Sequence, residues 1–379
     1  MALDWKDLTR EDRLTFLMVS PTSLNDVYGE LEGVDLSNSS LDAAYYTDVR
    51  TSGTLSVVGD GWVRGSLIRV VHEVPSWGWK RTIGTYIVTD DMASRSNGVW
   101  RYDLTLQSML YGLSTDLLVR PWTIAKNAMA LKAMRDCLNV AAYKHTIVSG
   151  ANDYKLKTPQ VMESGTSRLA CLYSLCTMAN DRLDVNPNGY VTVSKYVKPA
   201  SLAPSARIDL SDPRGIALDD LSRSTDWLQM VDTAAVSFKY SDTVKKDGKS
   251  TTVQKEINAY AKVSSSLHQA HGVRGFTVTD FRSLSELTPQ TAARAQQLAN
   301  QYLKENAPEL VTWELTTTYL PVWEGDVVEL VVHDGLNAYQ GIRKCLVRNV
   351  ELDLGTMTMH LTLKETASGD KGDTDGSTG

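Results

Sequence analysis

The 379-residue sequence lacks an uninterrupted apolar run of the length that crosses a membrane, about 18 or more residues. Its first residues, MALDWKDLTRED, are charged where a secretory signal needs a basic start followed by an apolar stretch. We therefore expect neither a membrane-spanning segment nor export through a signal peptide.

Cysteine is scarce. The 4 cysteines, Cys137, Cys171, Cys176 and Cys345, are spread too widely for a zinc ligand set or a small disulfide scaffold. We expect all of them to be buried free thiols, because an unpaired cysteine usually behaves as a small interior residue.

The common catalytic motifs are missing. The sequence contains no GxSxG, no CxxC, no Walker-type loop and no GxGxxG after a strand. His268 and His271 lack the glutamate of the zinc-protease HExxH motif, so we interpret them as polar loop residues. Cys137 and His145 could form a thiol nucleophile and its base, but Cys137 lies near the apolar stripe of an expected helix. The sequence therefore predicts no catalytic residue, no metal ligand and no cofactor.

Paired carboxylates occur at Asp90-Asp91 and at Asp219-Asp220. A glycosidase needs two carboxyl groups about 5 to 10 Å apart across a cleft. Adjacent residues of a strand point to opposite faces. Both pairs are therefore interpreted as turn or surface residues.

The overall composition is that of a folded protein, with 42% hydrophobic and 22% charged residues. The formal net charge of −6 argues against tight nucleic-acid binding, which needs clustered lysine and arginine. A surface that lets DNA slide past is still compatible with this charge.

Alternation of apolar and polar residues predicts antiparallel strands at 68–74 and 100–107. Glycine-containing stretches at 59–61 and 96–98 supply the positive φ angles that tight hairpin turns require. The N-terminal part is therefore expected to be a half-buried antiparallel sheet.

Helical periodicity begins after Pro121, where apolar residues recur every three or four positions over 124–141 with Thr123 as the N-cap. A second helical stripe over 169–183 leads into a hairpin with the tip Asn186-Pro187-Asn188-Gly189. A third helix is predicted from its cap Thr288 and from Pro289 at its first position.

The remaining segments are less regular. Residues 201–226 are irregular, 236–240 alternate as a strand, and the following stretch is expected to be a solvated hairpin tip or loop. Three lysines there, Lys245, Lys246 and Lys249, could touch nucleic acid, but nearby Asp242 and Asp247 favour a solvated tip. Strands return at 327–332, 346–353 and 357–363. The tail after Thr366 has two Gly-X-Y triplets, too few for collagen, and is expected to be disordered.

Two strand pairs form an internal repeat. Residues 86–90 followed by 102–107 have a counterpart in 345–349 followed by 359–364, and each pair ends in an apolar-Thr-apolar triplet. We interpret this as a structural duplication, with two unrelated hairpins as the alternative. Two similar ring-forming domains in one chain would let a homotrimer present six near-equivalent faces.

Tryptophans cluster at Trp77 and Trp79, with Trp62 and Trp100 nearby in the sequence. In a β-domain such a cluster favours core packing or a subunit interface. The alternative is a platform on which a sugar stacks.

These patterns divide the chain into five parts. They are an N-terminal arm with a first β-barrel-like domain (1–120), a mixed α/β insertion (121–206), a discontinuous second β-barrel-like domain (207–240 and 307–365), a loop and helix subdomain (241–306) and a disordered tail (366–379).

The order of these parts resembles the tail hub family of long-tailed bacteriophages, also called baseplate hub or tail-tip minor tail proteins. The resemblance is carried by an Ala- and Gln-rich helix (292–302), a strand at 311–320, the Trp-Glu-Gly-Asp sequence at 323–326, and the closing LGTMTMHLTLK. The passage DVNPNGYVTV is similar to the middle region of the family. The resemblance covers most of residues 40–365.

The resemblance implies an α+β, β-rich fold in which two related antiparallel β-barrel-like tube domains carry helical or mixed insertions and form a homotrimeric ring. Such a protein is structural and not an enzyme, and it sits at the virion tail tip after assembly in the host cytoplasm. Its implied partners are a distal tail ring or tube protein, the tape-measure protein, and a central fibre or spike, with DNA passing through the bore.

Two further expectations follow from the resemblance. Acidic groups such as Asp103, Glu351 and Asp353 could face the bore, where they would limit the sticking of DNA. The alternative function is a carbohydrate-binding tail-tip module that recognises the host cell surface through the Trp77 and Trp79 region.

Overall fold

The structure, a computed structural model, describes most of the chain. The described residues are 5, 10–59, 61–139, 147–151, 153–156, 159–179, 181–212, 217–225, 233–246, 249–262, 311–332 and 341–366, with helical residues 292, 293, 295, 296, 299, 300 and 303. Within these ranges no helix has the length and apolar character needed to cross a membrane.

The first β-unit comprises residues 13–108. Its strands are β1 (Arg13–Val19), β2 (Val27–Glu30), β3 (Val34–Ala44), β4 (Thr51–Val58), β5 (Leu67–Val74), β6 (Trp79–Ser96) and β7 (Val99–Ser108), with a 3-10 turn at Pro75–Trp77. The predicted turn at 96–98 is confirmed, because Asn97 and Gly98 both have positive φ and close the β6–β7 hairpin. The stretch at 59–61 closes no tight hairpin, since β4 pairs with β3 and β7 whereas β5 pairs with β1 and β6.

A mixed insertion follows and ends in a 3-10 turn at Pro199–Ser201. It contains α1 (Met109–Thr115), β8 (Trp122–Ile124), α2 (Ala130–Asn139), β9 (Ile147–Ser149), β10 (Gln160–Met162), α3 (Arg168–Ala179), β11 (Asp181–Val185) and β12 (Val191–Lys195). The prediction that Thr123 caps a helix is wrong, because Thr123 lies in β8 opposite Val161 of β10. Helix α2 begins seven residues later, where the Asp153 carboxylate accepts from the backbone N–H of Leu131. The second helix is confirmed as α3, although Leu183, the last residue of its predicted apolar stripe, lies in β11. The hairpin at 186–189 is also confirmed.

The second β-unit is built from β13 (Ala206–Asp209), β14 (Ala217–Thr225), β17 (Val311–Thr318), β18 (Val327–Val332), β19 (Gly341–Asp353) and β20 (Thr358–Glu365). The expectation that 201–226 is irregular is wrong. Among the described strands β14 pairs with β17 alone, and its polar sequence lacks the alternation that marks a half-buried strand.

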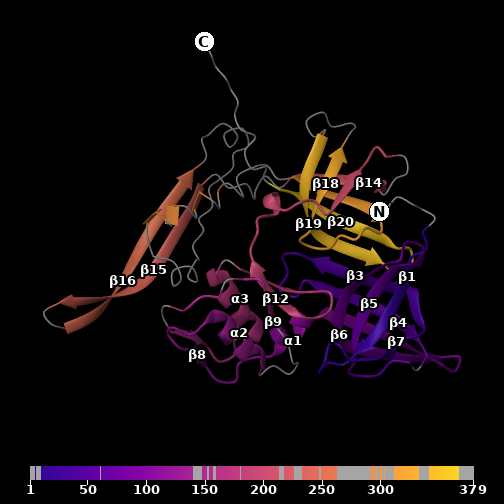
Figure 1. The fold of residues 1–379 in the computed structure, drawn as a ribbon, viewed down its shortest axis with the longest axis horizontal. Coiled ribbons are helices and arrows are strands. Elements are labelled where there is room, and N and C mark those ends of the chain that lie inside the picture. The colour runs from indigo at the N-terminus through magenta and orange to yellow at the C-terminus, as the bar shows by residue number, and fades with distance from the viewer. Residues whose placement is uncertain are drawn as a thin grey trace, which may run out of the picture.

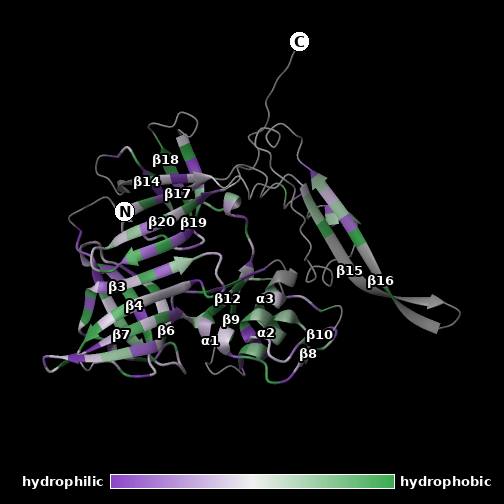
Figure 2. Cartoon of the chain, turned by 180° about the vertical axis from the view of Figure 1, so that it is seen from behind, coloured by the Kyte–Doolittle hydropathy of each residue, from purple (hydrophilic) through white to green (hydrophobic). Residues whose placement is uncertain are grey.

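A separate two-stranded hairpin consists of β15 (Thr233–Lys246) and β16 (Lys249–Lys262). Figures 1 and 2 show this hairpin apart from both β-units. The strand predicted at 236–240 lies in β15, and among the described strands β15 pairs with β16 alone, so it does not extend the sheet of the second β-unit. The third helix is confirmed at its described residues, of which Ala295, Ala299 and Leu303 pack on the hairpin. Its predicted cap, Thr288 with Pro289, lies outside the described residues.

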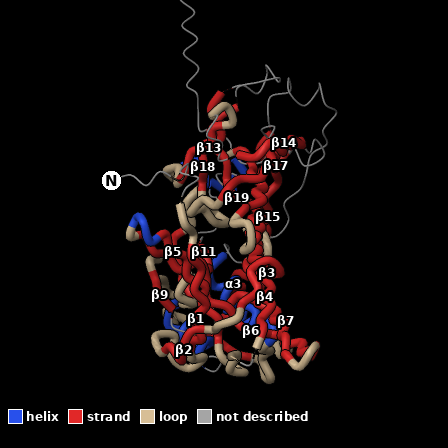
Figure 3. Tube along the Cα trace, turned by 90° about the vertical axis from the view of Figure 1, so that its right-hand side faces the viewer, coloured by secondary structure: helices blue, strands red, loops and turns tan. Residues whose placement is uncertain are grey.

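The two β-units share one sheet and one core. The main sheet has 13 strands, and its path runs β14-β17-β20-β19-β3-β4-β7-β6-β5-β1-β2 with β18 and β13 branching from β19. One hydrophobic cluster extends from Phe16 in the first unit to Leu363 in the second. Figure 3 shows the second unit stacked above the first, with the helices at the level of the first. Along the described path the two ends of the sheet do not pair, so a barrel-like closure of either unit stays a prediction.

The strand pairs of the internal repeat have the same register. Val88 lies opposite Leu106 and Asp90 opposite Thr105, so Thr89 forms a bulge in β6. In the second unit Val347 lies opposite Leu363 and Asn349 opposite Thr362, so Arg348 forms the corresponding bulge in β19. A bulge is a specific feature of a sheet, and its recurrence at the matching position supports the predicted repeat.

The correspondence extends to neighbouring strands. Strand β4 lies against β7 as β17 lies against β20, with Leu55 opposite Leu104 and Leu315 opposite Leu361. The turns before β5 and β18 also match, since Gly65 and Gly325 have the same φ of 86°. The backbone N–H of Ser66 donates to the carbonyl of Val63, and that of Asp326 donates to the carbonyl of Trp323. Both hydrogen bonds are 3.1 Å long.

Candidate functional site

The two β-units are joined by direct pairing of β3 with the C-terminal half of β19. Leu41 lies opposite Leu352 and Ala43 opposite Val350, and all four side chains are buried. The backbone N–H of Tyr45 donates to the carbonyl of Arg348 at 2.8 Å, which extends the join by one more step. We call this pairing the seam. It makes the sheet continuous from the second unit into the first.

One face of this continuous sheet is buried and the other is polar. Because side chains alternate along each strand, the registers place the residues between the core positions together on the opposite face. This polar face comprises Ser40, Asp42, Ser52, Thr54, Ser56, Asp103, Thr105 and Gln107 from the first unit, and Ser222, Ser224, Glu314, Thr316, Asn349, Glu351, Asp353, Thr358, His360 and Thr362 from the second. Figure 2 shows hydrophobic and hydrophilic bands alternating along these strands.

The polar face is acidic. Asp42 lies opposite Glu351 across the seam, and burial together with the nearby Glu351 raises the pKa of the Asp42 carboxyl. Several polar groups are held by neighbours on the same face: the Ser56 hydroxyl donates to Asp103 at 2.9 Å, and the Ser222 hydroxyl donates to Glu314 at 3.1 Å. Two hollows, of about 500 and 370 Å³, lie on this face on either side of Glu351. The sequence named Asp103, Glu351 and Asp353 as candidates for a bore, and the registers place all three on this one surface.

A half-buried charged junction lies where the insertion meets both units. The Asp184 carboxylate of β11 accepts from Arg50 of the first unit at 3.0 Å and from Arg182 at 2.6 Å. Glu324, in the turn before β18, lies beside this cluster, and burial together with the Asp184 charge raises its pKa to about 8. Gly325 packs against the Arg182 guanidinium and the Tyr45 ring. The junction therefore fixes the insertion against the seam.

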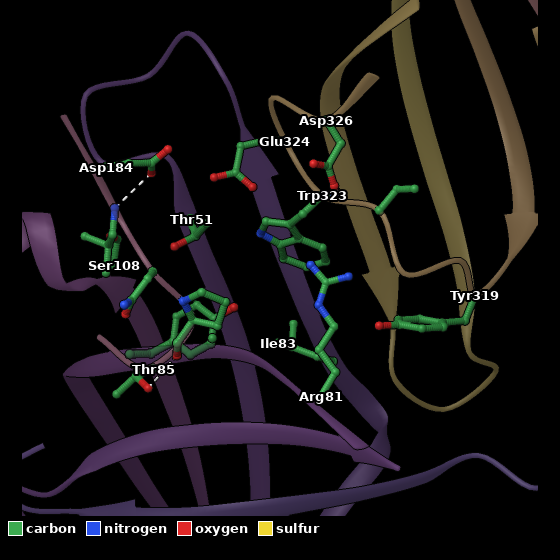
Figure 4. Close-up of a pocket in the computed structure, with 16 residues that line it drawn as sticks. Thr51, Arg81, Ile83, Thr85, Ser108, Asp184, Tyr319, Trp323, Glu324 and Asp326 are labelled. Atoms are coloured by element: carbon green, nitrogen blue, oxygen red, sulfur yellow. Dashed lines mark hydrogen bonds between the residues drawn. The ribbon is translucent and has the colours of Figure 1, made fainter. Parts of the chain in front are cut away.

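A cavity of about 170 Å³ opens beside this junction, as Figure 4 shows. Arg81, Trp323 and Glu324 line it together with Tyr86, and burial raises the pKa of the Tyr86 hydroxyl above its usual range. Within the part of the chain that the structure describes, no group of three or more His, Cys, Asp or Glu side chains could hold a metal ion.

The other candidate residues are dispersed. Cys137 is buried on α2, and its thiol points to the Arg168 carbonyl, whereas His145, His268 and His271 lie outside the described residues. All four cysteines are buried and free, as predicted.

The two carboxylate pairs lie in different strands of the main sheet. In β6, Asp91 forms an ion pair with Arg64 at 2.9 Å, while its neighbour Asp90 is exposed. Asp219 and Asp220 lie in β14, and Lys245, Lys246 and Lys249 lie at the tip of the β15–β16 hairpin.

The tryptophans form two groups. Trp5 packs edge-on between Trp77 and Trp79, with ring centroids 5.2 and 4.9 Å away. Trp62 and Trp100 both contact Tyr102 in the first unit, with centroids 6.5 and 6.4 Å away. The first group is therefore occupied by intramolecular packing, in line with the structural interpretation of these residues.

Sequence reasoning missed the seam. The signal was present in Leu41 and Ala43, which alternate with Ser40 and Asp42, but a bulge in β3 hides it. Between Asp35 and Ser40 the register shifts, so the alternation before this point does not continue through it.

Comparison with known proteins gives matches in structure alone. No protein-family profile and no curated protein sequence matches the chain. Among solved structures, a tail protein from Neisseria meningitidis MC58 matches with a TM-score of 0.63 at 13% identity, covering 93% of this chain and 96% of that one.

Two further matches are similar in extent. The 43 kDa tail protein of prophage MuSo2 from Shewanella oneidensis matches with a TM-score of 0.59 at 10% identity, over 93% of this chain and 98% of that one. The prophage tail protein gp18 from Listeria monocytogenes EGD-e matches with a TM-score of 0.57 at 10% identity, over 94% and 95%. The fold of this chain is therefore that of phage tail proteins over nearly its whole length.

Proposed function

We propose that this chain is a structural hub protein of a bacteriophage tail tip, in which three copies form a ring with a pseudo-six-fold arrangement of β-units. The fold shared with phage tail proteins over nearly the full length supports a structural role in a tail. The observation that carries the ring is the seam between two β-units of matching register.

The repetition of the β-unit within the chain supports a ring. Two β-units are joined side by side within one chain. They share the bulge in β6 and β19 and the turn before β5 and β18. When a unit pairs with its neighbour through different edges, the contact is head-to-tail, and repeated head-to-tail contacts close into a ring or continue as a filament. Three chains would supply six units, which fits a six-fold tail tube on one side and a three-fold fibre or spike on the other.

The polar face fits the surface of a bore. It is continuous across the seam, it carries hydroxyl, amide and carboxylate groups, and Asp42, Glu351 and Asp353 meet on it. Like charges repel DNA phosphates and keep a passing strand from sticking. We therefore assign this face to the lumen through which DNA and the tape-measure protein pass.

The proposed partners follow from this place in the particle. The ring would bind a distal tail ring or tube protein on one side and a central fibre or spike on the other, and it would be assembled in the host cytoplasm. The proposed role is structural and involves no catalysis. The chain assembles into the tail and lets DNA and the tape-measure protein pass.

The location can be tested on particles induced from a host that carries this coding sequence. An epitope fused after Thr366, at the end of the last described strand, should be labelled by gold-conjugated antibody at the tail end distal to the head. Label on the head, or spaced along the whole tube, would overturn the proposed position.

A further inference from the structure

The C-terminal half of β6 has one open edge. Strand β7 pairs with β6 from Tyr86 to Ser96, but β5 pairs with it only as far as Tyr86. Among the described strands, none pairs with the β5-side edge of residues 90–96. An open edge presents unpaired backbone N–H and C=O groups, which favour the addition of another strand.

The corresponding edge of β19 is paired with another strand. The two bulges align Asp90 with Asn349, so Met92 corresponds to Glu351 and Ala93 to Leu352. That part of β19 pairs with β3 at the seam. The second unit therefore shows how such an edge is satisfied within this fold.

The strand that corresponds to β3 is β14. Strand β3 lies against β4 as β14 lies against β17, and each has a register shift in its first half. This alignment matches Leu41 with Arg223 and Asp42 with Ser224. Strand β14 pairs with β17 alone in the described sheet, so its outer edge is open as well.

We propose that β14 of a second copy of this chain pairs with the open edge of β6 in the register of the seam. Met92 then lies opposite Ser224 of the second copy, and Ala93 lies opposite Arg223. This inference rests on the proposed ring and names the contact that closes it. The pairing is head-to-tail, because β6 and β14 are different edges of the chain.

The side chains near this edge fit the pairing. Met92 is 64% exposed on the polar face, where it lies opposite Asp103, and Trp100 is 38% exposed on the other face. Tyr102 stacks with Trp100 and corresponds to Met359, which is fully buried beside the seam. A strand added to β6 would stand to Tyr102 as β3 stands to Met359, with one strand between them.

Charge favours the same register. Arg223 of the second copy would lie on the face of Ala93, in line with Tyr102 across the sheet and two residues from Asp91, whose carboxylate also pairs with Arg64. Diagonal opposite charges on a sheet attract each other, and a guanidinium near an aromatic ring is favourable.

The test is disulfide cross-linking of Met92→Cys combined with Ser224→Cys. Both native side chains are exposed and the four native cysteines are buried, so the substitutions leave the core untouched and the background is low. Under mild oxidation the double variant should give a ladder of covalent oligomers that ends at three chains and collapses with dithiothreitol. Each single variant should stay uncross-linked.

A matched control tests the register. Met92→Cys with Ser222→Cys places the second thiol two residues along the same face, and it should cross-link at least about tenfold more slowly, because the Cβ atoms are too far apart for a disulfide. Equal rates for the two pairs would overturn the proposed register.

Native mass spectrometry of the same samples separates the two proposals. Three-chain assemblies without cross-linking in either pair would overturn the β6–β14 contact while leaving the ring intact. A single-chain mass at every concentration would overturn the contact and the ring together.

Discussion

Leu41 of β3 lies directly opposite Leu352 of β19, and neither side chain is exposed to solvent. These residues are more than three hundred positions apart in the chain, and their contact joins the two β-units into one sheet. The seam therefore contributes both to the stability of the monomer and to the proposed geometry of the assembly.

Truncation at the seam should destabilise the whole β-body. Leu352→Ala is expected to lower the free energy of unfolding by about 2–5 kcal/mol, because it removes buried methyl groups and leaves a cavity. Urea unfolding followed by tryptophan fluorescence measures this change, and Asp353→Asn, an exposed neighbour on β19, serves as the control. A loss no larger than in the control would show that the seam does not hold the two units together.

The two matching glycines allow a paired experiment. Gly65→Ala and Gly325→Ala each force a side chain into a φ of 86°, which costs about 1–2 kcal/mol. Around Gly65 a new Cβ meets open space, whereas at Gly325 it would come within 2.7 Å of Arg182 and 3.0 Å of Tyr45. Gly325→Ala should therefore lower the melting temperature more than Gly65→Ala does. Equal decreases in melting temperature would mean that Arg182 and Tyr45 move aside without any loss of stability.

The stability of the junction should depend on pH through Glu324. Its pKa is raised to about 8 in the folded protein by burial and by Asp184, above its value of 4.5 in the unfolded chain. Below pH 4.5 the Glu324 carboxyl is protonated in both the folded and the unfolded state, so it does not lower the free energy of unfolding. As the pH rises towards 8 the unfolded state releases the proton more readily, so folding loses stability.

Glu324→Gln removes this titration while keeping the shape of the side chain. The variant should gain stability relative to the parent between about pH 5 and pH 8.5, by on the order of 2–4 kcal/mol. Denaturation midpoints at a series of pH values measure the difference. Parallel curves for the two proteins across this range would contradict the assignment of the raised pKa to Glu324.

The carboxylates of the polar face should keep its affinity for DNA low. Glu351→Lys combined with Asp353→Lys should create salt-dependent binding to double-stranded DNA that the parent lacks, because lysine releases counterions from phosphate. Fluorescence anisotropy in about 50 mM and 200 mM salt measures it. Asp136→Lys with Glu163→Lys, on the insertion, changes the net charge equally. Binding as strong in this control as on the face would show that the location of the charges is irrelevant.

The sequence predicted the parts of the fold that rest on local pattern. Alternation located β5 and β7, the helical stripe located α3, and the repeated triplets at 104–106 and 361–363 located two strand pairs that share a bulge. These features are local, because period and turn chemistry act over a few residues.

What the sequence did not predict depends on distant contacts. Helix α2 begins at Ala130 because Asp153, from a later loop, caps it, and Thr123 lies in a strand because 160–162 pairs with it. Strand β14 is polar and paired on one side, so only its register with β17 identifies it. The polar face likewise becomes visible only when the seam places Asp42 beside Glu351.

The trimeric ring is tested most directly by the mass of the purified chain, measured by native mass spectrometry and paired with negative-stain images. We expect three chains of 41.8 kDa each in a closed ring with a central opening. A single chain at all concentrations, or an open filament in place of a ring, would contradict it.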